Sequence, residues 1–327
     1  MNTPLTSDFA HLTPDHVLAT VEDALRRPFT NLCRPLNSYI NRVFEVQADD
    51  GEWIIAKFYR PGRWSTAALN DEMTFLAELA AEDIPVVAPL GPPGLRHDAR
   101  GLPFALFPKR GGRPLVEPRP EQWQELGRLI ARVHVVGARH PPEDRVELHP
   151  YEATSDHLDT ILDFPFPHHS LHRDYEDIAE AILETIAPLF EDIPYLRIHG
   201  DCHSQNILAR PGEPLTLIDF DDMAIGPAIQ DLWMLLPDHL KHARQELDLI
   251  LDGYRSFRTM PPREVNLIEP LRAMRFIHYT AWCVRQRADG GFARLAPDFG
   301  TPSYWKQEID DLQRQQQEIL DSLEARP

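Results

Sequence analysis

The chain has 327 residues, 43% of them hydrophobic, and carries 33 lysine and arginine against 51 aspartate and glutamate residues. It can therefore bury a large core, and its length suggests two lobes. The formal charge of -18 excludes a nucleic-acid partner, because such a surface repels phosphate backbones. Binding an anionic nucleotide requires a local cluster of cations or backbone N–H groups.

The cysteine count and the apolar segments bear on the compartment. Cys33, Cys202 and Cys283 are too scattered for a disulfide framework or a four-thiolate zinc site, which fits a reducing cytoplasm. Residues 1–10 lack a signal-peptide pattern, and no apolar stretch is long enough to cross a bilayer. We expect a cytoplasmic monomer with no membrane partner.

The first third of the chain predicts a helix and a small sheet. A Thr-Pro pair opens a helix near residue 14, and an Asp-Gly pair joins two β-rich runs into an antiparallel hairpin. A helix with an apolar stripe and another short strand come next. The predicted segments are the strands 38–46, 53–59 and 103–107 and the helix 66–81.

The remainder of the chain predicts a mainly helical lobe. Residues 108–114 are rich in turn formers and charge, so we divide the chain into lobes at 1–108 and 109–327. Helical spacing recurs five times beyond this linker, interrupted by short apolar strands. The expected helices are 121–136, 175–190, 243–257, 265–287 and 304–323, and the expected strands are 195–198, 207–208 and 215–218. The resulting class is α+β, with a small antiparallel-sheet N-terminal lobe and a larger helical C-terminal lobe.

One motif within the second lobe indicates phosphoryl transfer. Asp201 can accept a hydroxyl proton, Asn206 follows five positions later, and Asp219 lies beyond a short hairpin. The transition state of this reaction spreads negative charge over the phosphate oxygens, so cations must surround it. Mg²⁺ prefers amide and carboxylate oxygens, which makes Asn206 and Asp219 candidate metal ligands.

Two charged residues of the first lobe complete the pattern. Lys57 is the single cation of an apolar strand, and Glu72 lies fifteen residues later on the next helix. Either residue alone is usually a solvated surface charge. In this order before the Asp motif, however, they predict an ion pair that holds the lysine over nucleotide phosphates.

The motif His-Gly-Asp-x-x-x-x-Asn at 199–206, followed by Ile-Asp-Phe-Asp at 218–221, is similar to the aminoglycoside phosphotransferase and choline kinase group, relatives of the protein kinases. Segments 35–44, 57–61, 231–236 and 268–275 more narrowly resemble bacterial stress response kinases, serine/threonine protein kinases of the same size. The resemblance spans nearly the whole chain. It implies a bilobal protein-kinase-like fold that uses ATP and Mg²⁺ to phosphorylate Ser or Thr of proteins, including itself.

The resemblance also implies roles for individual residues. Asp201 matches the proton acceptor, and Asp219 counts both as a catalytic residue and, with Asn206, as a metal ligand. Lys57 and Glu72 match the nucleotide-holding pair, and Ser38 matches an ATP contact in the first loop. The family's hinge beside the adenine corresponds to the region of Phe107 and Pro108.

Two departures from protein kinases stand out. No Gly-x-Gly-x-x-Gly follows Pro35, so phosphate coverage falls to Asn37, Ser38 and local N–H groups. Asp219-Phe220-Asp221 replaces Asp-Phe-Gly, and a residue other than glycine there disfavours a flip of the loop.

Three other functions compete with a protein kinase. His199, Asp201 and His203 have the spacing of metallohydrolase ligands, although such a site needs further ligands. A phosphotransferase for a small aminoalcohol or an aminoglycoside uses the same loop, and the acidic net charge favours cationic substrates. The third is a nucleotide-binding module without catalysis.

Several further residues have a structural and a functional interpretation. We expect His199 to support the loop, Cys202 to be a buried inert thiol, and Asp231 to accept backbone hydrogen bonds. His203 remains open between a scaffold and a phosphate contact. An ordinary surface arginine is slightly favoured at positions 60 and 63, and a solvated acidic turn competes with a metal ligand at 221–222. At Arg272 and Arg275, a position facing the substrate cleft and a surface ion pair with an acidic residue both remain open. We expect packing roles for Trp233, Trp282 and Trp305.

Overall fold

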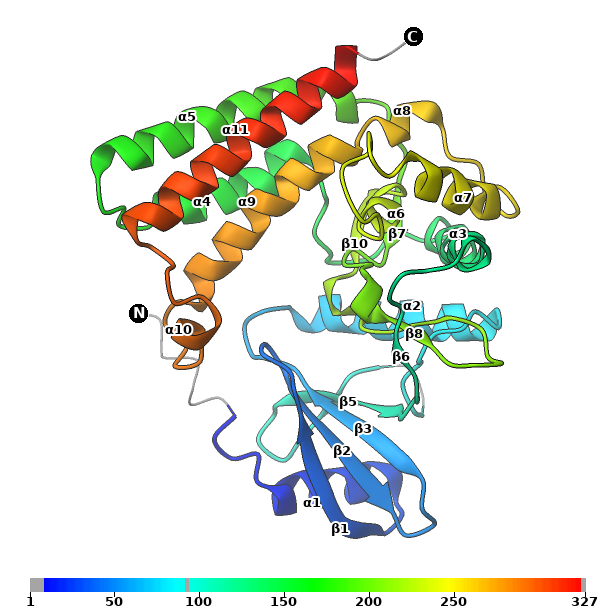
Figure 1. Cartoon of the computed structure of the whole chain (residues 1–327). Helices are drawn as coiled ribbons and strands as arrows, with labels where there is room; N and C mark the ends of the chain where they lie inside the picture. Colours follow the sequence, from blue (N-terminus) through cyan, green and yellow to red (C-terminus); the bar gives the residue numbers. More distant parts are fainter. Residues whose placement is uncertain (1–8, 92–93, 325–327) are drawn as a thin grey trace.

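The structure is a computed structural model that describes residues 9–91 and 94–324. A small sheet with a flanking helix lies at one end, and a larger helical assembly lies at the other (Figure 1). The mixed fold class predicted from the sequence is confirmed. Most of the N-terminal stretch considered for a signal peptide, residues 1–8, lies outside the described residues.

The elements have the following bounds. The helices are α1 (Pro14–Leu25), α2 (Thr66–Ala81), α3 (Pro120–Gly137), α4 (Ser155–Leu162), α5 (His169–Ile186), α6 (Gln230–Trp233), α7 (Arg244–Tyr254), α8 (Pro262–Val265), α9 (Ile268–Gln286), α10 (Phe292–Leu295) and α11 (Pro302–Glu324). The strands are β1 (Phe29–Leu36), β2 (Arg42–Ala48), β3 (Trp53–Phe58), β4 (Arg96–His97), β5 (Pro103–Pro108), β6 (Arg113–Pro114), β7 (Tyr195–Ile198), β8 (Ile207–Ala209), β9 (Thr216–Leu217) and β10 (Ala224–Pro227).

The N-terminal sheet has two differently covered faces because successive side chains of a strand point to opposite sides. Its order is β1-β2-β3-β5-β4, with antiparallel neighbours throughout. Ile54 and Phe58 of β3 pack in the cluster that contains Val17 and Val21 of α1. Ile55 instead packs against the larger cluster that includes α2 and the helical lobe. Lys57 shares the phase of Ile55, so the pleat directs it towards the cleft.

The first strand is where the prediction from sequence fails most clearly. The strand expected at 38–46 begins only at Arg42, and a preceding strand, β1, was missed. Strand β1 lies at the sheet edge and is mostly exposed, so it lacks the apolar alternation that marks a half-buried strand. Consequently Ser38 lies in the loop between β1 and β2.

Other boundaries also differ. Helix α5 begins at His169 rather than at 175, and α4 was not predicted. The helix expected at 265–287 is α9, which begins three residues later, and the short helix α8 before it was not predicted. The other predicted helices and the short strands are present within a few residues of their expected ends, which is where helix ends normally vary.

Two layers of helices surround the short strands of the C-terminal lobe. Helices α3 and α7 approach so closely that a Cβ at Gly127 would overlap the backbone of Ile250, and one at Gly253 would overlap that of Gln124. Helices α4, α5, α9 and α11 form the second group (Figure 1). Along the described ranges, none of the helices combines the length and apolar composition that crossing a bilayer demands.

The connection between the lobes runs from β5 to β6. Strand β5 ends at Pro108 in the N-terminal sheet, and β6 pairs with β8 in a separate three-stranded sheet. We propose that the boundary between the lobes lies between these strands, as the linker composition predicts.

Candidate active site

Lys57 is buried and lies among three carboxylates. Its Nζ is 2.9 Å from Asp219 Oδ1, 3.4 Å from Asp221 Oδ1 and 3.7 Å from Glu72 Oε1. Burial opposes the charge, but these three carboxylates together hold the pKa of Lys57 well above its usual value. The lysine is therefore a permanent cation at neutral pH.

Helix α2 supplies Glu72, which the sequence predicts as the partner of Lys57. Ser65 caps this helix by accepting a hydrogen bond from the Ala68 N–H, and the apolar stripe of α2 turns Glu72 inward. The side chain is 2% exposed, and burial raises its pKa while Lys57 partly offsets this effect. The hydroxyl of Tyr59 donates to Glu72 Oε1 at 3.3 Å.

The loop that carries Asp201 is held by one buried carboxylate. Asp231, at the start of α6, accepts hydrogen bonds from the backbone N–H groups of His199 at 2.7 Å and Gly200 at 2.9 Å. His134 Nε2 lies 3.0 Å from the same side chain. The expected supporting role of Asp231 is thus observed, and the donors belong to the catalytic loop rather than to a helix.

Gly200 is required by two local constraints. Its φ is +82°, which is a left-handed conformation, and an added Cβ would overlap the carbonyl oxygen of Asp222. The loop before Asp201 and the loop after Asp219 therefore touch through their backbones.

Both carboxylate oxygens of Asp201 have partners. Arg275 Nη2 donates to Oδ1 at 2.8 Å, and His203 Nε2 lies 3.3 Å from Oδ2. Although burial raises the pKa of Asp201, the His203 contact and the charge of Arg275 bring it below the usual range. Asp201 is therefore ionised at neutral pH.

The two candidate metal ligands are tied to neighbouring backbone. Asn206 Nδ2 donates to the carbonyl of Asp201 at 3.0 Å, so its amide nitrogen is engaged within the loop. The carbonyl of Asn206 accepts from the Ile218 N–H at 3.0 Å, which places Asp219 next to this loop. Asp219 has φ +63°, and its side chain is 54% exposed. One amide oxygen and one accessible carboxylate fit a hard cation such as Mg²⁺.

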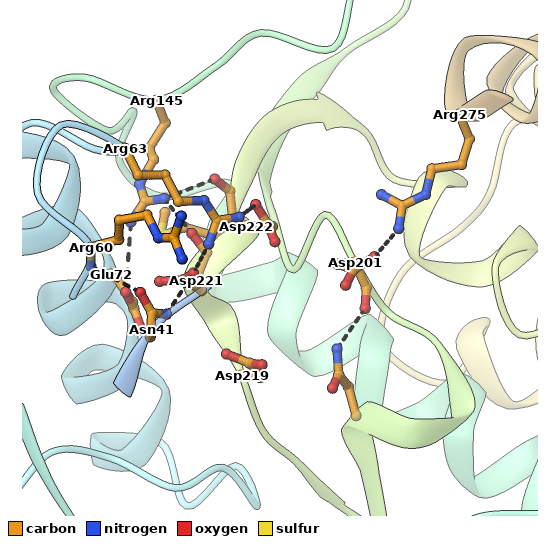
Figure 2. Close-up of polar contacts among 12 residues, drawn as sticks. Asn41, Arg60, Arg63, Glu72, Arg145, Asp201, Asp219, Asp221, Asp222 and Arg275 are labelled. Atoms are coloured by element: carbon orange, nitrogen blue, oxygen red, sulfur yellow. Dashed lines mark hydrogen bonds and ion pairs between the residues drawn. The ribbon is translucent and has the colours of Figure 1, made fainter. Parts of the chain in front are cut away.

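Asp221 and Arg63 form an ion pair beside this site. Arg63 Nη1 donates to Asp221 Oδ2, and its Nη2 donates to Asp222 Oδ1 at 2.6 Å (Figure 2). Asn41 Nδ2 donates to the same oxygen of Asp221 at 3.2 Å. Asp221 is only 5% exposed, so it is not a solvated turn residue.

The surface assignment of Arg60 and Arg63 is wrong. Arg60 is 5% exposed and bonds Asp289 at 3.1 Å, while Arg63 pairs with two carboxylates that lie about 160 positions away in the chain. Composition cannot reveal such partners. They exist only after the two lobes come together.

A cavity of about 740 Å³ unites most of the predicted site residues. It is lined by Ser38, Lys57, Glu72, Asp201 and Asp219, together with Phe107 and Pro108. Asn206 is not among the lining residues, and its contact with the group runs through the Asp201 backbone. The walls of the cavity therefore include the Lys57–Glu72 pair, the proposed base Asp201 and one proposed metal ligand, Asp219.

The histidines of the motif do not form a metal cluster with Asp201 in the described part of the chain. His199 is 1% exposed, its Nε2 is 2.9 Å from the Ile218 carbonyl, and its ring packs on Phe220. The compact His/carboxylate group that does form there joins His11, His16 and Asp98, far from the motif in sequence. His199 thus has the predicted scaffold role, and the metallohydrolase interpretation loses its ligands.

Some functional neighbours were missed. Arg145 is buried and donates from Nη1 to the Asp221 carbonyl at 2.8 Å, yet a lone arginine in a polar loop gives no sequence signal. Asn41 was also missed, because a single asparagine gives no sequence signal either. Trp282 was assigned to packing, but it lines the cavity and stacks on Tyr279 at 5.8 Å between ring centroids.

A two-lobed fold, a buried lysine–glutamate pair and an Asp-Asn-Asp loop at one cleft together define a phosphotransferase of the protein-kinase-like class. The sequence profile of the phosphotransferase enzyme family matches residues 32–264. The chain belongs to this family. The resemblance stated from the sequence motifs is therefore confirmed.

Relatives and solved structures agree with this assignment. The chain is 36% identical to Stress response kinase A of Escherichia coli (strain K12) over 304 residues, covering 91% of this chain and 90% of that protein. It is also 36% identical to the serine/threonine protein kinase RdoA of Salmonella typhimurium (strain LT2) over 278 residues, 84% of each chain. Amicoumacin kinase hAmiN, solved with AMP-PNP, Ca²⁺ and Ami, has a TM-score of 0.68 at 21% identity, covering 94% of this chain and 93% of that one. The microcompartment-associated aminopropanol kinase has a TM-score of 0.66 at 18% identity, with coverages of 94% and 98%.

Proposed function

We propose that this phosphotransferase moves the γ-phosphoryl group of ATP, with Mg²⁺, to Ser or Thr hydroxyls of proteins and of its own chain, within a stress response. The observation that carries the proposal is the shared cavity, because it places an ionised Asp201 and the Lys57–Asp219 pair on the walls of one space. The choice of a protein acceptor rests on the 36% identical relatives, one of which is named a serine/threonine protein kinase.

The proposed chemistry divides among the residues of the site. Lys57, with Ser38 and the loop around it, holds the phosphates of ATP, while the region of Phe107 and Pro108 lies beside the adenine. Asn206 and Asp219 would hold Mg²⁺ through their oxygens, and the ion would supply positive charge to the phosphate oxygens. Asp201 accepts the hydroxyl proton as the hydroxyl oxygen forms its bond to phosphorus and the bond to the ADP oxygen breaks. Glu72 keeps Lys57 in place.

Two variants test these roles. Asp201→Asn and Asp219→Asn each remove a carboxylate with little change of volume, and we expect each to abolish phosphate transfer from radiolabelled ATP to protein. Thermal melts of both variants establish that the fold survives. Transfer at the wild-type rate in either folded variant would refute its proposed role.

The second candidate is a kinase for a small alcohol. It is favoured by the fold neighbours, which are named as kinases of amicoumacin and aminopropanol, although their identities of 21% and 18% carry the fold alone. Incubation with ATP and a protein extract, in parallel with a panel of aminoalcohols, separates the two candidates. Phosphate found only on small molecules would overturn the protein-kinase proposal. Nucleotide binding without turnover on any acceptor would identify a non-catalytic module.

A further inference from the structure

A second cavity continues the cleft beyond Asp201. Its volume is about 550 Å³, and its lining includes Gly200, which precedes the proposed base. Arg275, His278 and Trp282 line both this cavity and the first one. Because Lys57 and Asp219, one of the proposed metal ligands, line the first cavity, we take the second as the space left for the acceptor.

The two helices that border this space bring cations to it. Arg275 and Arg285 come from α9, while His157 comes from α4 and packs its ring 4.7 Å from that of His278. Burial, together with the two arginines, lowers the pKa of His157 to about 4, and it lowers the pKa of His278 well below the usual value. Both imidazoles are therefore neutral at pH 7, and the positive charge belongs to the guanidinium groups.

The arginines of this cavity differ in how far their charge is already matched. Arg60 and Arg63 are paired with Asp289 and with Asp221 and Asp222, so they are neutralised within the protein. Arg285 donates to the hydroxyl of Thr160 at 3.1 Å and has no carboxylate ion pair among the described residues, although Asp156 lines the same cavity and its charge acts on Arg285. Arg285 therefore retains charge for a ligand, in a protein whose net charge is -18.

Arg275 has a different position, because its partner is the proposed base. Figure 2 shows Arg275 reaching Asp201 separately from the Arg63 group. Its side chain remains 34% exposed, and only one of its five N–H donors is engaged in this bond. Its other donors are therefore in a position to bind an anion of the acceptor.

We propose that the acceptor carries a carboxylate or phosphate close to its hydroxyl, and that Arg275 and Arg285 bind this anion. This inference rests on the proposed function: for a protein acceptor, the anion is an acidic or phosphorylated residue beside the Ser or Thr. The planar guanidinium matches both anions with paired hydrogen bonds. The preference is opposite to the cationic substrates that the net charge alone suggests.

The test compares matched peptides that contain a single Ser. Aspartate, asparagine or lysine occupies the flanking positions, and kcat and KM are measured with ATP for the full chain. We expect the aspartate peptide to exceed the asparagine peptide at least about tenfold in kcat/KM, equivalent to about 1.4 kcal/mol. Arg275→Gln and Arg285→Gln should each reduce this ratio. Arg285→Glu should shift the preference towards the lysine peptide.

A distant arginine supplies the matched control. Arg255 is exposed at the C-terminal end of α7 and pairs with Asp252, so Arg255→Gln should keep the wild-type peptide ratio. Melting curves verify that each variant is folded. A ratio that stays unchanged in folded Arg275→Gln, Arg285→Gln and Arg285→Glu would overturn the inference.

The substrate panel separates this inference from the proposed function. Equal rates on all three peptides, or a preference for lysine or for aminoalcohols, would overturn the anion preference. If the enzyme phosphorylated the peptides at equal rates or preferred the lysine peptide, the protein-kinase proposal would still stand. A small-molecule arm contains hydroxycarboxylates and phosphorylated alcohols beside their uncharged analogues. Selective phosphorylation of the anionic members, with no peptide modified, would support the anion inference and remove the protein acceptor.

Discussion

The two sides of the cleft treat their positive charges differently. On the side proposed for the nucleotide, Lys57 and Arg63 are each surrounded by carboxylates of the protein, and most of these contacts are buried. On the side proposed for the acceptor, Arg285 has a hydroxyl partner and Arg275 shares its charge with Asp201, the proposed base. Charges neutralised internally hold loops in place, whereas charges left partly unmatched are available to a ligand. Mutations on the two sides should therefore affect different measurements.

The largest expected effect is on catalysis at the acceptor side. Asp201→Asn should lower kcat by about 10²–10⁴-fold, the usual contribution of a general base. The melting temperature should change little, because the Arg275 partner left behind is 34% exposed and can be solvated. Steady-state kinetics and thermal melts measure the two effects, with Asp252→Asn on the exposed face of α7 as control. Retention of more than a tenth of the rate would argue against the base.

The nucleotide side should respond in stability instead. Asp221→Asn leaves Lys57 and Arg63 short of a buried partner, and we expect the free energy of unfolding to fall by about 3 kcal/mol or more. Asp222→Asn is the matched control, because its side chain is 37% exposed and pairs with the same arginine. The control should lose about 1 kcal/mol or less. Urea unfolding measures both free energies. Equal losses in the two variants would contradict a special contribution of the buried Asp221 carboxylate to stability.

A smaller effect concerns pH and His203. The hydrogen bond to Asp201 raises the pKa of His203, although burial opposes it, while the pKa of Asp201 lies below its usual range. The ion pair therefore stabilises the fold below the usual histidine pKa, and this contribution is lost as pH rises through the raised one. On the carboxylate side, the contribution is present above the usual aspartate pKa and is lost as pH falls to the lowered one.

The same titration should appear in the rate. As His203 loses its proton, Asp201 becomes a stronger base, and kcat should rise by at most about tenfold, since a change of one in a pKa corresponds to about 1.4 kcal/mol. His203→Asn should flatten this step in a profile of kcat against pH. A step that persists unchanged in the variant would assign it to another group.

The smallest expected effect is at Cys202, beside the base. The thiol is fully buried, and burial together with Asp231 and Asp201 raises its pKa well above the usual value. We expect iodoacetamide to leave Cys202 unmodified in the folded enzyme while the half-buried Cys33 reacts. Peptide mass spectrometry measures both sites. Equal labelling of the two sites would contradict the inert, buried role of Cys202.

The predictable parts of the molecule are those with local patterns. Lys57 and Glu72 could be paired from the order of a strand and a helix, and the Asp201 loop could be recognised within eight residues. Strand β1 escaped because an exposed edge strand shows no alternation. Arg275 lies 74 positions from Asp201, and their contact depends on how α9 packs in the assembled lobe. Local spacing contains no information about such a distance.

The backbone contact at Gly200 limits how this enzyme can be controlled. There is no room for a Cβ between Gly200 and the Asp222 carbonyl, so the loop of the proposed base and the loop of the proposed metal ligand are packed directly against each other. Any swing that carried Asp219 away would have to drag the Asp201 loop with it or break this packing. On and off states made by moving one loop past the other are therefore costly for this chain. We therefore expect the activity to be regulated by the access of the acceptor hydroxyl to the cleft.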